Sequence, residues 1–400
     1  MKLAIYCPDF YPAVSGYSFA FQDLVRGLCD EGVEVDVFTP GALGAASELV
    51  IPGLRVIRLQ HTEPLRHIKY ARALWNVLSK PRQTAAIIAR EHQSRRYDAV
   101  LSETMEDPLI LLSLPSELRA RTIVRVHGCA ETEQAMWDRT LVWRFKHRLI
   151  QRALGRHIRY ITATAEYYLG FVRHHFLRDN ALLIADKRFA VIPNSAPRLV
   201  EAARAIASTT ARRRFMTLGR MNWVGANQKG FDDILMALHE MTPEQRRRIH
   251  LTVIGQGEEQ SRLRAVASTI SNVEIEFVAG LPNAQVRELL RSVDGVILAS
   301  RYEGMSVFAL EAIGSGAPVI FSDAGGIAGL VRNNGRRFSA GDPRSLAAAW
   351  SEMLDASPQE WHEMSRASLS VAAGLTPDLA ARALIRFLSV VQPSASTNGA

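Results

Sequence analysis

Two glutamates in the second half of this chain lie where acidic side chains can hold a sugar. Glu303 lies in a small polar loop after an apolar stretch, residues 296–299, and Glu311 lies two turns into the helix expected after that loop. Carboxylates accept hydrogen bonds from hydroxyl groups, as acidic residues do with a ribose diol in dinucleotide sites. Taken alone, two glutamates at this spacing more often complement a helix dipole and face solvent.

The loop between the glutamates adds backbone donors to this pattern. A helix is expected to begin near Met305, and the free amides at a helix N-terminus favour an anion. The amides that such a start exposes belong to Gly304, Met305 and Ser306. The segment therefore predicts a site for a ligand that carries both hydroxyl groups and negative charge.

Two cations precede this segment. Arg220 follows an apolar stretch, residues 215–218, and Lys229 comes shortly after it. Fixed positive charges can stabilise a phosphate leaving group, although a surface salt bridge is the other interpretation of Arg220. The sequence shows no Asp-x-Asp motif at a strand end and no Ser-His or Cys-His pair of nucleophile and base. We therefore expect no bound metal and no cofactor.

Short apolar stretches alternate with helical patterns along the chain. Strands alternating with helices predict parallel sheets covered on both faces, with ligands outside the carboxyl ends of the strands. The expected strands are residues 3–6, 33–38, 54–59, 99–102, 122–126, 160–164 and 189–192, followed by 215–218, 249–254, 273–278, 295–299 and 319–321.

Two α/β units of similar size follow from this pattern. A turn-forming segment from Pro193 to Pro197 and a stretch rich in alanine and arginine separate them. The expected organisation is a first domain over 1–197, a linker over 198–212, a second domain over 213–375, a final helix over 376–391 and a flexible polar tail over 392–400.

Composition excludes several classes of protein. Of 400 residues, 48% are hydrophobic and 22% are charged, which excludes a disordered, collagen-like or disulfide-stapled chain. No apolar run approaches the roughly 18 residues of a membrane span. The three cysteines have no metal-ligand spacing. We expect a cytoplasmic protein with more than one domain.

The net charge of +8 is concentrated in the first half. Residues 1–200 hold 27 Lys and Arg against 20 Asp and Glu, and residues 139–159 hold seven basic residues and no acid. If this segment forms a helix, its basic residues share one face, which suits contact with an anionic membrane surface or simply exposure to solvent. That face carries Arg144, Arg148, Arg152 and Arg156. Without a zinc-finger or RNP-like motif, we expect no nucleic-acid partner.

The run from Ser300 to Ile320 resembles the E-x7-E signature of retaining GT-B glycosyltransferases, specifically glycosyltransferase family 4. That signature continues with Glu-Ala, small residues and Gly-x-Pro-Val-Ile, as this chain does from Glu311 to Ile320. Further motifs occur in the family's order. They are Gly219-Arg220 with Lys229-Gly230, the strand ending Gly255-x-Gly257, and Gly325-Gly326.

The resemblance implies a fold and an activity. The GT-B fold has two Rossmann-like, doubly wound parallel-sheet domains that face across a cleft, and its last helix returns to the first domain. The first domain binds the acceptor and the second binds the nucleotide sugar. The implied activity is a retaining, metal-independent transfer to a lipid-linked saccharide or to a lipopolysaccharide or exopolysaccharide intermediate. A small-molecule acceptor and a catalytically inactive scaffold are the alternatives.

The resemblance also implies roles for single residues. Arg220 and Lys229 bind the donor diphosphate, Glu303 contacts the donor sugar, and Glu311 contacts the ribose. His127, at the end of the strand over 122–126, faces the donor sugar. The remaining donor-pocket positions are Gly219, Gly255 and the amides of Gly304, Met305 and Ser306. Ser15 and Gly16 match the Gly-rich loop where acceptor and phosphate meet.

The chain departs from the family pattern in three places. Residues 221–228 make the stretch between Arg220 and Lys229 longer than usual, and we expect an extra loop beside the donor site. Gly304-Met-Ser replaces the family's Pro-x-Phe-Gly type, which keeps the small loop and its amides. Ala328 and Gly329 stand where a glutamate is common, so that contact is not expected here.

Overall fold

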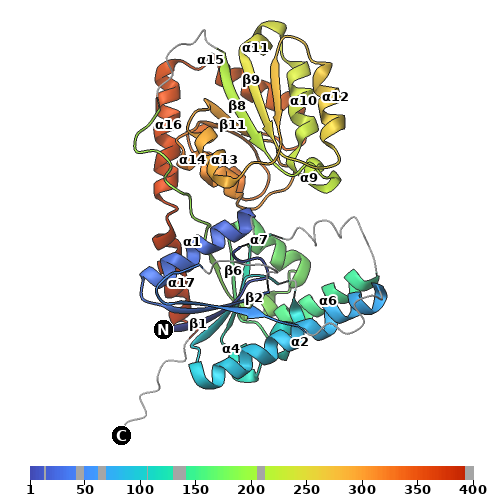
Figure 1. The fold of residues 1–400 in the computed structure, drawn as a ribbon, viewed down its shortest axis with the longest axis vertical. Helices are drawn as coiled ribbons and strands as arrows, with labels where there is room; N and C mark the ends of the chain where they lie inside the picture. The colour runs from blue at the N-terminus through green and yellow to red at the C-terminus, as the bar shows by residue number, and fades with distance from the viewer. Residues whose placement is uncertain are drawn as a thin grey trace. The chain divides into compact units, whose positions relative to one another are not determined.

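The computed structural model contains two compact units, each an open α/β sheet with helices on both faces (Figure 1). It describes residues 1–12, 15–41, 49–61, 69–105, 107–128, 141–204 and 212–391. One unit is Met1–Asn194 together with the segment from Pro377, and the other is Ser195–Thr376. The chain therefore changes unit at Ser195, slightly before the expected boundary at 197. The expected tail, 392–400, lies outside the described residues.

The sheet of the first unit is parallel throughout, in the order β3-β2-β1-β4-β5-β6-β7 among the described residues. Its elements in chain order are β1 (Lys2–Tyr6), α1 (Gly16–Asp30), β2 (Glu34–Pro40), β3 (Leu54–Leu59), α2 (Lys69–Arg95), β4 (Ala99–Ser102), α3 (Pro108–Ser113), α4 (Ser116–Ala120), β5 (Thr122–Val126), α6 (Leu141–Arg156), β6 (Tyr160–Ala163), α7 (Glu166–Phe171), a π-helical turn (Val172–Phe176), α8 (Ala181–Ala185) and β7 (Arg188–Val191).

Helices cover this sheet because successive residues of each buried strand point to opposite faces. In β1, Leu3 and Ile5 pack against α1 and the C-terminal helix α17 (Pro377–Ser389), whereas Ala4 and Tyr6 belong to the core on the other face. All four side chains are buried. This explains why the strand is continuously apolar apart from its first residue.

The last helix among the described residues belongs to the first unit. Helix α17 packs along α1 (Figure 1), and Leu384 and Leu388 join the core formed by Phe21 and Leu24. The two helices approach closely at Gly27, where a Cβ atom would lie 2.6 Å from the carbonyl oxygen of Pro377. A larger residue at this position would push α17 away from the core.

The second sheet is also parallel, in the order β10-β9-β8-β11-β12-β13 among the described residues. Its elements are β8 (Arg213–Leu218), α9 (Trp223–Lys229), α10 (Phe231–Glu240), α11 (Pro243–Arg247), β9 (Ile249–Ile254), α12 (Gln260–Ser268), β10 (Glu274–Val278), α13 (Asn283–Leu290), β11 (Gly295–Leu298), α14 (Val307–Gly314), β12 (Val319–Ser322), a 3-10 turn (Ile327–Leu330), β13 (Gly335–Phe338), α15 (Pro343–Asp355) and α16 (Pro358–Ala373).

The predicted fold class, two doubly wound parallel-sheet units, is confirmed. In each sheet the strand order reverses at one place, between β1 and β4 in the first unit and between β8 and β11 in the second. Loops diverge at such a switch point and leave a crevice outside the carboxyl ends of the strands, which is where ligands of open α/β sheets bind. We therefore expect the candidate residues to lie at these two switch points.

Candidate functional site

Lys229 and Glu303 form an ion pair at the switch point of the second sheet. Lys229 is the last residue of α9, which follows β8, and Glu303 lies in the loop after β11. The Lys229 ammonium contacts Oε2 of Glu303, and the Ser300 hydroxyl donates to the same oxygen at 3.1 Å. Both charged side chains are largely buried, at 16% and 12% exposure. The structure thus brings together two of the predicted residues from distant parts of the chain.

Two glycines allow this meeting. Gly230 adopts a left-handed conformation with φ of 63°, and a Cβ atom there would lie 2.1 Å from the carbonyl oxygen of Ala299. A Cβ atom at Gly219 would lie 2.6 Å from Cγ of Lys229. The backbone therefore comes close enough for the lysine to reach Glu303 only because both positions lack a side chain.

Gly255 serves a neighbouring contact between loops. A Cβ atom at this position would lie 2.0 Å from the carbonyl oxygen of Gly219. The loop after β9 therefore packs directly on the loop after β8, which carries Arg220. The structure assigns Gly219 and Gly255 a shared packing role at the edge of the candidate site.

Arg220 is exposed at the same switch point. Its nearest described hydrogen-bond partner is Oε1 of Gln228, at 3.5 Å from Nη2. It has no ion-pair partner within the described part of the chain, so the surface salt bridge considered from the sequence is not observed there. The guanidinium is thus available to an incoming anion.

A second arginine nearby is committed to the fold. Arg301 makes a bidentate ion pair with Asp233 of α10, with distances of 2.9 and 2.8 Å. Its backbone amide also donates to the carbonyl oxygen of Gln228 at 2.8 Å. The hydrogen bonds that Arg301 donates to Asp233 raise the pKa of Arg301. These contacts fix the loop that carries Glu303 against α9 and α10.

Helix α14 begins at Val307, two residues later than the sequence predicted. Gly304 and Ser306 are buried and Met305 is partly buried, and Ser306 is the N-cap residue without a side-chain capping bond. The amide of Gly326 donates to the carbonyl oxygen of Glu303 at 3.1 Å. The Gly-Gly motif therefore holds the backbone of the Glu303 loop.

Glu311 has partners that the sequence did not predict. Its Oε1 accepts from Nδ2 of Asn283 at 2.8 Å and from Nε of Arg287 at 2.9 Å, both on α13. The glutamate is almost fully buried, at 3% exposure. Glu311 therefore joins α14 to α13, and a role in ligand binding would involve its other carboxylate oxygen.

The segment expected as an extra loop forms a helix instead. Residues Trp223–Lys229 make α9, and the side chain of Asn222 caps it by accepting from the amide of Gly225 at 2.8 Å. Met221 is buried, whereas Trp223 is two-thirds exposed. An Asn N-cap in front of seven residues is a local signal that the loop interpretation overlooked. The consequence is that Lys229 is held at the end of a helix.

His127 belongs to a buried cluster at the carboxyl ends of β4 and β5 in the first unit. Its Nε2 contacts Oε2 of Glu103 and lies 2.8 Å from Nη1 of Arg125. Arg125 also bonds to Glu103 at 3.2 Å, and its Nη2 donates to Asn194 at 3.2 Å. Asn194 is therefore a buried partner of Arg125, whereas the sequence suggested mainly a turn residue.

The protonation of this cluster follows from its contacts. Burial and the charge of Arg125 lower the pKa of His127, so the imidazole is neutral near pH 7. Nε2 of His127 lies between the Glu103 carboxylate, which only accepts hydrogen bonds, and the Arg125 guanidinium, which only donates them. Burial alone would raise the pKa of Glu103, but Arg125 and His127 hold it below its usual range. The cluster thus contains one buried ion pair and an oriented, neutral histidine.

Ser15 is the N-cap of α1 and Gly16 is its first residue, and α1 is the first helix after β1 among the described residues. The Ser15 hydroxyl accepts from the amide of Ser18 at 3.0 Å and donates to Asp9 at 2.5 Å. Gly16 is the exposed first residue of the helix. Both residues lie at the carboxyl end of β1, and the two residues before Ser15 lie outside the described chain.

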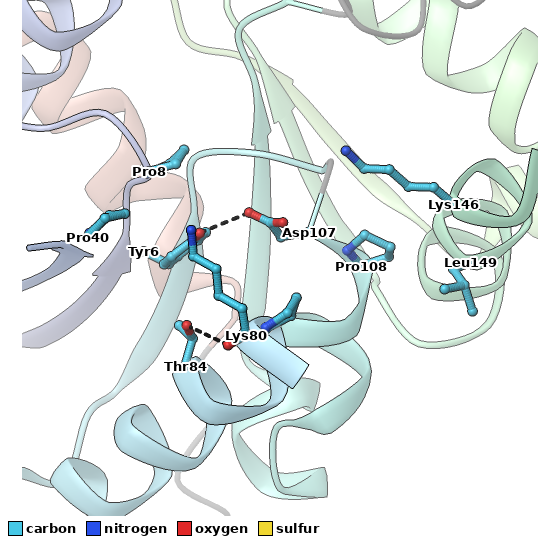
Figure 2. Close-up of a pocket in the computed structure, with 10 residues that line it drawn as sticks. Tyr6, Pro8, Pro40, Lys80, Thr84, Asp107, Pro108, Lys146 and Leu149 are labelled. Carbon is cyan, nitrogen blue, oxygen red and sulfur yellow. Dashed lines mark hydrogen bonds between the residues drawn. The ribbon is translucent and has the colours of Figure 1, made fainter. Parts of the chain in front are cut away.

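A cavity of about 320 Å³ opens at the switch point of the first sheet (Figure 2). The hydroxyl of Tyr6, the last residue of β1, donates a hydrogen bond to Asp107 at 2.9 Å. Asp107 lies in the loop after β4, so this bond joins the two sides of the switch point. Burial and the charge of Asp107 raise the pKa of Tyr6, so the phenol keeps its proton. The side chains of Lys80 and Lys146 point into the same cavity from α2 and α6 (Figure 2).

The described residues contain no group of three or more His, Cys, Asp or Glu arranged to hold a metal ion. The described helices also include none with the length and apolar character that crossing a membrane requires. Glu103, Arg125 and Arg287 are not among the residues that the sequence predicts for these sites. Arg125 could have been noticed, because a charged residue within an apolar five-residue strand needs a buried partner.

Two family models match this chain, one for each unit. The model described as "Glycosyl transferase 4-like domain" matches residues 15–195, and the model described as "Glycosyl transferases group 1" matches residues 212–356. Each match covers most of one sheet and its helices. The two matches meet near the place where the chain passes from one unit to the other.

Curated relatives resemble the chain over different lengths. Glycogen synthase of Mycobacterium tuberculosis is 30% identical over 159 residues, which span 36% of this chain and only 35% of that enzyme. The 2-deoxystreptamine N-acetyl-D-glucosaminyltransferase of Streptomyces fradiae is 26% identical over 339 residues, covering 81% of this chain and 78% of that enzyme.

Solved structures share the fold over almost the whole chain. Sucrose-phosphate synthase from Thermosynechococcus elongatus has a TM-score of 0.73, at 16% identity, and covers 97% of this chain and 99% of that one. WaaG, a glycosyltransferase involved in lipopolysaccharide biosynthesis, has a TM-score of 0.65 at 16% identity, covering 99% and 100%. Anabaena Alr3699/HepE in complex with UDP-glucose has a TM-score of 0.68 at 16% identity, covering 98% and 100%.

The buried Glu103 cluster gives a testable prediction about stability. Glu103→Gln leaves the Arg125 guanidinium buried without its counter-charge, and we expect this to destabilise the protein by about 3–5 kcal/mol at pH 7. Because the pKa of Glu103 is lowered by folding, its contribution is complete above about pH 4.3 and is lost as the pH falls further. Denaturant unfolding from pH 7 to pH 3 measures both effects.

Glu117→Gln is the matched control, because Glu117 is exposed and its ion pair among the described residues is with Arg121. We expect this control to change stability by less than about 0.5 kcal/mol. The assignment would be contradicted if Glu103→Gln lost no more unfolding free energy than the control. It would also be contradicted if the stability difference between Glu103→Gln and the wild type increased as the pH falls.

Proposed function

Because the chain belongs to the GT-B glycosyltransferases of glycosyltransferase family 4, we propose that it is a retaining transferase. It moves a sugar from a nucleoside diphosphate sugar to an acceptor hydroxyl. The observation that carries this proposal is the convergence of Lys229, Glu303 and Arg220 at the switch point of the second sheet. A diphosphate and a sugar need cations and a hydrogen-bond acceptor side by side, and these residues supply both.

Arg220 and Lys229 are the proposed diphosphate ligands. Arg220 is exposed and has no ion-pair partner among the described residues, and Lys229 already lies against the carboxylate with which a diphosphate would compete. Positive charge placed at the leaving group stabilises the negative charge that develops there, an effect of several kcal/mol as a rough figure. We therefore propose a reaction that needs no metal ion, in which these two side chains compensate the diphosphate.

Glu303 is the proposed ligand of the donor sugar. When the diphosphate takes the Lys229 ammonium, the Glu303 carboxylate gains the capacity to accept bonds from sugar hydroxyls. The Ser300 hydroxyl and the backbone bond from Gly326 keep the carboxylate in place during this exchange. Glu311 is proposed to accept from the ribose through the oxygen that Asn283 and Arg287 leave unused.

The proposed transfer uses the same face of the sugar for departure and attack. The bond from the anomeric carbon to the phosphate oxygen breaks, and a bond from that carbon to the acceptor oxygen forms. The proton of the acceptor hydroxyl passes to the departing phosphate. His127, neutral and oriented by Glu103, is proposed to contact the transferred sugar from the first domain.

The acceptor is proposed to bind in the first unit. The cavity in Figure 2 has apolar walls from four prolines and polar groups from Tyr6, Asp107 and the two lysines. Its α6 wall bears Lys146 and Leu149, and the outer side of the same helix exposes Arg144, Arg148, Arg152 and Arg156. One helix thus combines a pocket wall with a basic surface. This favours a lipid-linked saccharide, or a lipopolysaccharide or exopolysaccharide intermediate, at the inner face of a membrane.

A small-molecule acceptor is the second candidate. The Streptomyces fradiae relative, which matches 81% of this chain, is named for transfer to 2-deoxystreptamine. A cavity of about 320 Å³ is at the lower end of the range of small-molecule pockets. Vesicle binding distinguishes a membrane-associated acceptor from a small-molecule acceptor, and nucleotide binding distinguishes both from an inactive scaffold.

A thermal-shift panel with UDP, GDP, ADP and dTDP tests the donor site. We expect one nucleotide at 100 times its dissociation constant to stabilise the wild type by about 2.7 kcal/mol. The stabilisation should be lost in Arg220→Ala, because the exposed arginine is a diphosphate ligand with little part in the fold. Arg366→Ala, an exposed arginine elsewhere in the same unit, is the control and should respond as the wild type does. If no nucleotide stabilises the wild type, the inactive scaffold is favoured.

Vesicle binding tests the basic face of α6. The apolar side of the helix, including Ile150 and Leu154, is buried in the core, so contact must be electrostatic and weaken with salt. We expect binding to phosphatidylserine vesicles and not to neutral ones, with about 1 kcal/mol from each arginine near the surface. Replacing Arg148 and Arg152 with Glu should abolish it.

The charge-matched control replaces Arg247 and Arg366 with Glu, because both are exposed in the second unit. Equal vesicle binding by the two double variants would rule out a specific role for α6. Absence of binding by the wild type would favour the small-molecule acceptor.

A further inference from the structure

A second polar cavity lies at the end of the second sheet where the strands begin. It is formed where β8 and β11 begin and just before β12, whereas the candidate donor site lies where β8 and β11 end. Its volume is about 130 Å³. We call it the arginine cavity, because Arg204, Arg214 and Arg291 line it together with Asp294, Trp361 and Ser365.

Arg204 has unused donors in this cavity. Its Nη1 donates to the carbonyl oxygens of Leu290 and Arg291 at 3.1 and 2.9 Å, but its Nη2 is buried and has no hydrogen-bond partner. Burial and the nearby charge of Arg214 lower the pKa of Arg204 to about 10, which still leaves it charged near pH 7. The arginine thus presents a charged donor without an acceptor.

Arg213 is a second underused guanidinium; it is not part of the cavity lining but packs on Trp361, which is. Its side chain is 2% exposed, and it lies over the ring of Trp361 at 5.1 Å from the ring centre. Its Nε and Nη2 are buried without hydrogen-bond partners. Neither Arg204 nor Arg213 has an ion-pair partner in the described part of the chain. Buried donors of this kind are costly unless an acceptor completes them.

The negative charge around the cavity is too small to balance these arginines. Asp294 accepts from the amide of Arg214 at 2.8 Å and lies 3.7 Å from its Nε. Glu288 pairs with Nη1 of Arg291 at 2.6 Å but is three-quarters exposed. The three arginines that line the cavity therefore have two carboxylates close to them among the described residues.

We propose that the arginine cavity binds one phosphate group. Several guanidinium groups with spare donors suit a tetrahedral oxyanion, which arginine recognises with paired hydrogen bonds. The volume equals that of about four water molecules, which admits a single phosphate group but not a nucleotide. The phosphate belongs to free inorganic phosphate or to a small phosphorylated metabolite whose remainder extends into solvent.

A bound phosphate would stabilise the segment through which the chain enters the second unit. The amide of Arg204 donates to the Ser365 hydroxyl at 2.8 Å, and Nε of Arg291 donates to the carbonyl oxygen of Leu199 at 3.0 Å. The phosphate would connect this segment with β8 and α13 through their arginines. The site is therefore proposed as a stabilising site, separate from the donor site.

Titration calorimetry with inorganic phosphate, at constant ionic strength set with chloride, tests the proposal on the full chain. We expect saturable binding at one site. Arg214→Gln, whose side chain is half-exposed, should weaken it by about tenfold or more, as should Arg204→Gln. If Arg204→Gln fails to fold, the Arg214→Gln comparison alone decides the outcome.

Two control variants identify where the phosphate binds. Arg247→Gln changes an exposed arginine of the same unit outside the cavity, and Arg220→Ala changes the donor site; both should keep the wild-type affinity. Loss of binding in Arg220→Ala alone, unchanged affinity in Arg214→Gln, or no saturable binding would overturn the proposal. A parallel titration with glucose 6-phosphate identifies the source. Tighter binding than phosphate supports a phosphorylated metabolite, and equal binding supports free phosphate.

Discussion

The ion pair between Lys229 and Glu303 is the interaction on which the functional account depends. It joins the segments that follow β8 and β11, the two strands between which the strand order reverses. A cation and a hydrogen-bond acceptor thereby lie in contact with each other. Neither residue acts alone in this arrangement, because each compensates the charge of the other until a diphosphate competes for the lysine. Arg220, exposed beside them, adds the second cation that a diphosphate requires.

Backbone proximity makes this interaction possible. Gly230 and Gly219 occupy positions where a side chain would collide with the end of β11 or with the lysine stem, and Gly255 packs on Gly219 from the next loop. The first unit also positions polar groups at its strand ends, but through a buried cluster. In this cluster Glu103 neutralises Arg125, and Arg125 orients His127. In both units the polar groups lie at carboxyl ends of strands beside a switch point, where loops diverge.

The sequence predicted the fold class and most strands because short apolar stretches and their alternation with helices are local signals. It also predicted that Arg220, Lys229 and Glu303 belong to one site, through the family resemblance and not through spacing. It could not predict the partners of Glu311, because Asn283 and Arg287 come from another helix. The α9 helix was missed because a short insertion has little periodicity. The arginine cavity depends on tertiary contacts that no local pattern reveals.

Calorimetric titration of Lys229→Met and Glu303→Gln with UDP and GDP tests the central claim most directly. If Lys229 exchanges Glu303 for the diphosphate, Glu303→Gln removes an internal competitor and should keep or increase the affinity for the nucleoside diphosphate. Lys229→Met should decrease that affinity by about tenfold or more. A decrease of equal size in both variants would contradict the exchange and assign the pair a purely structural role.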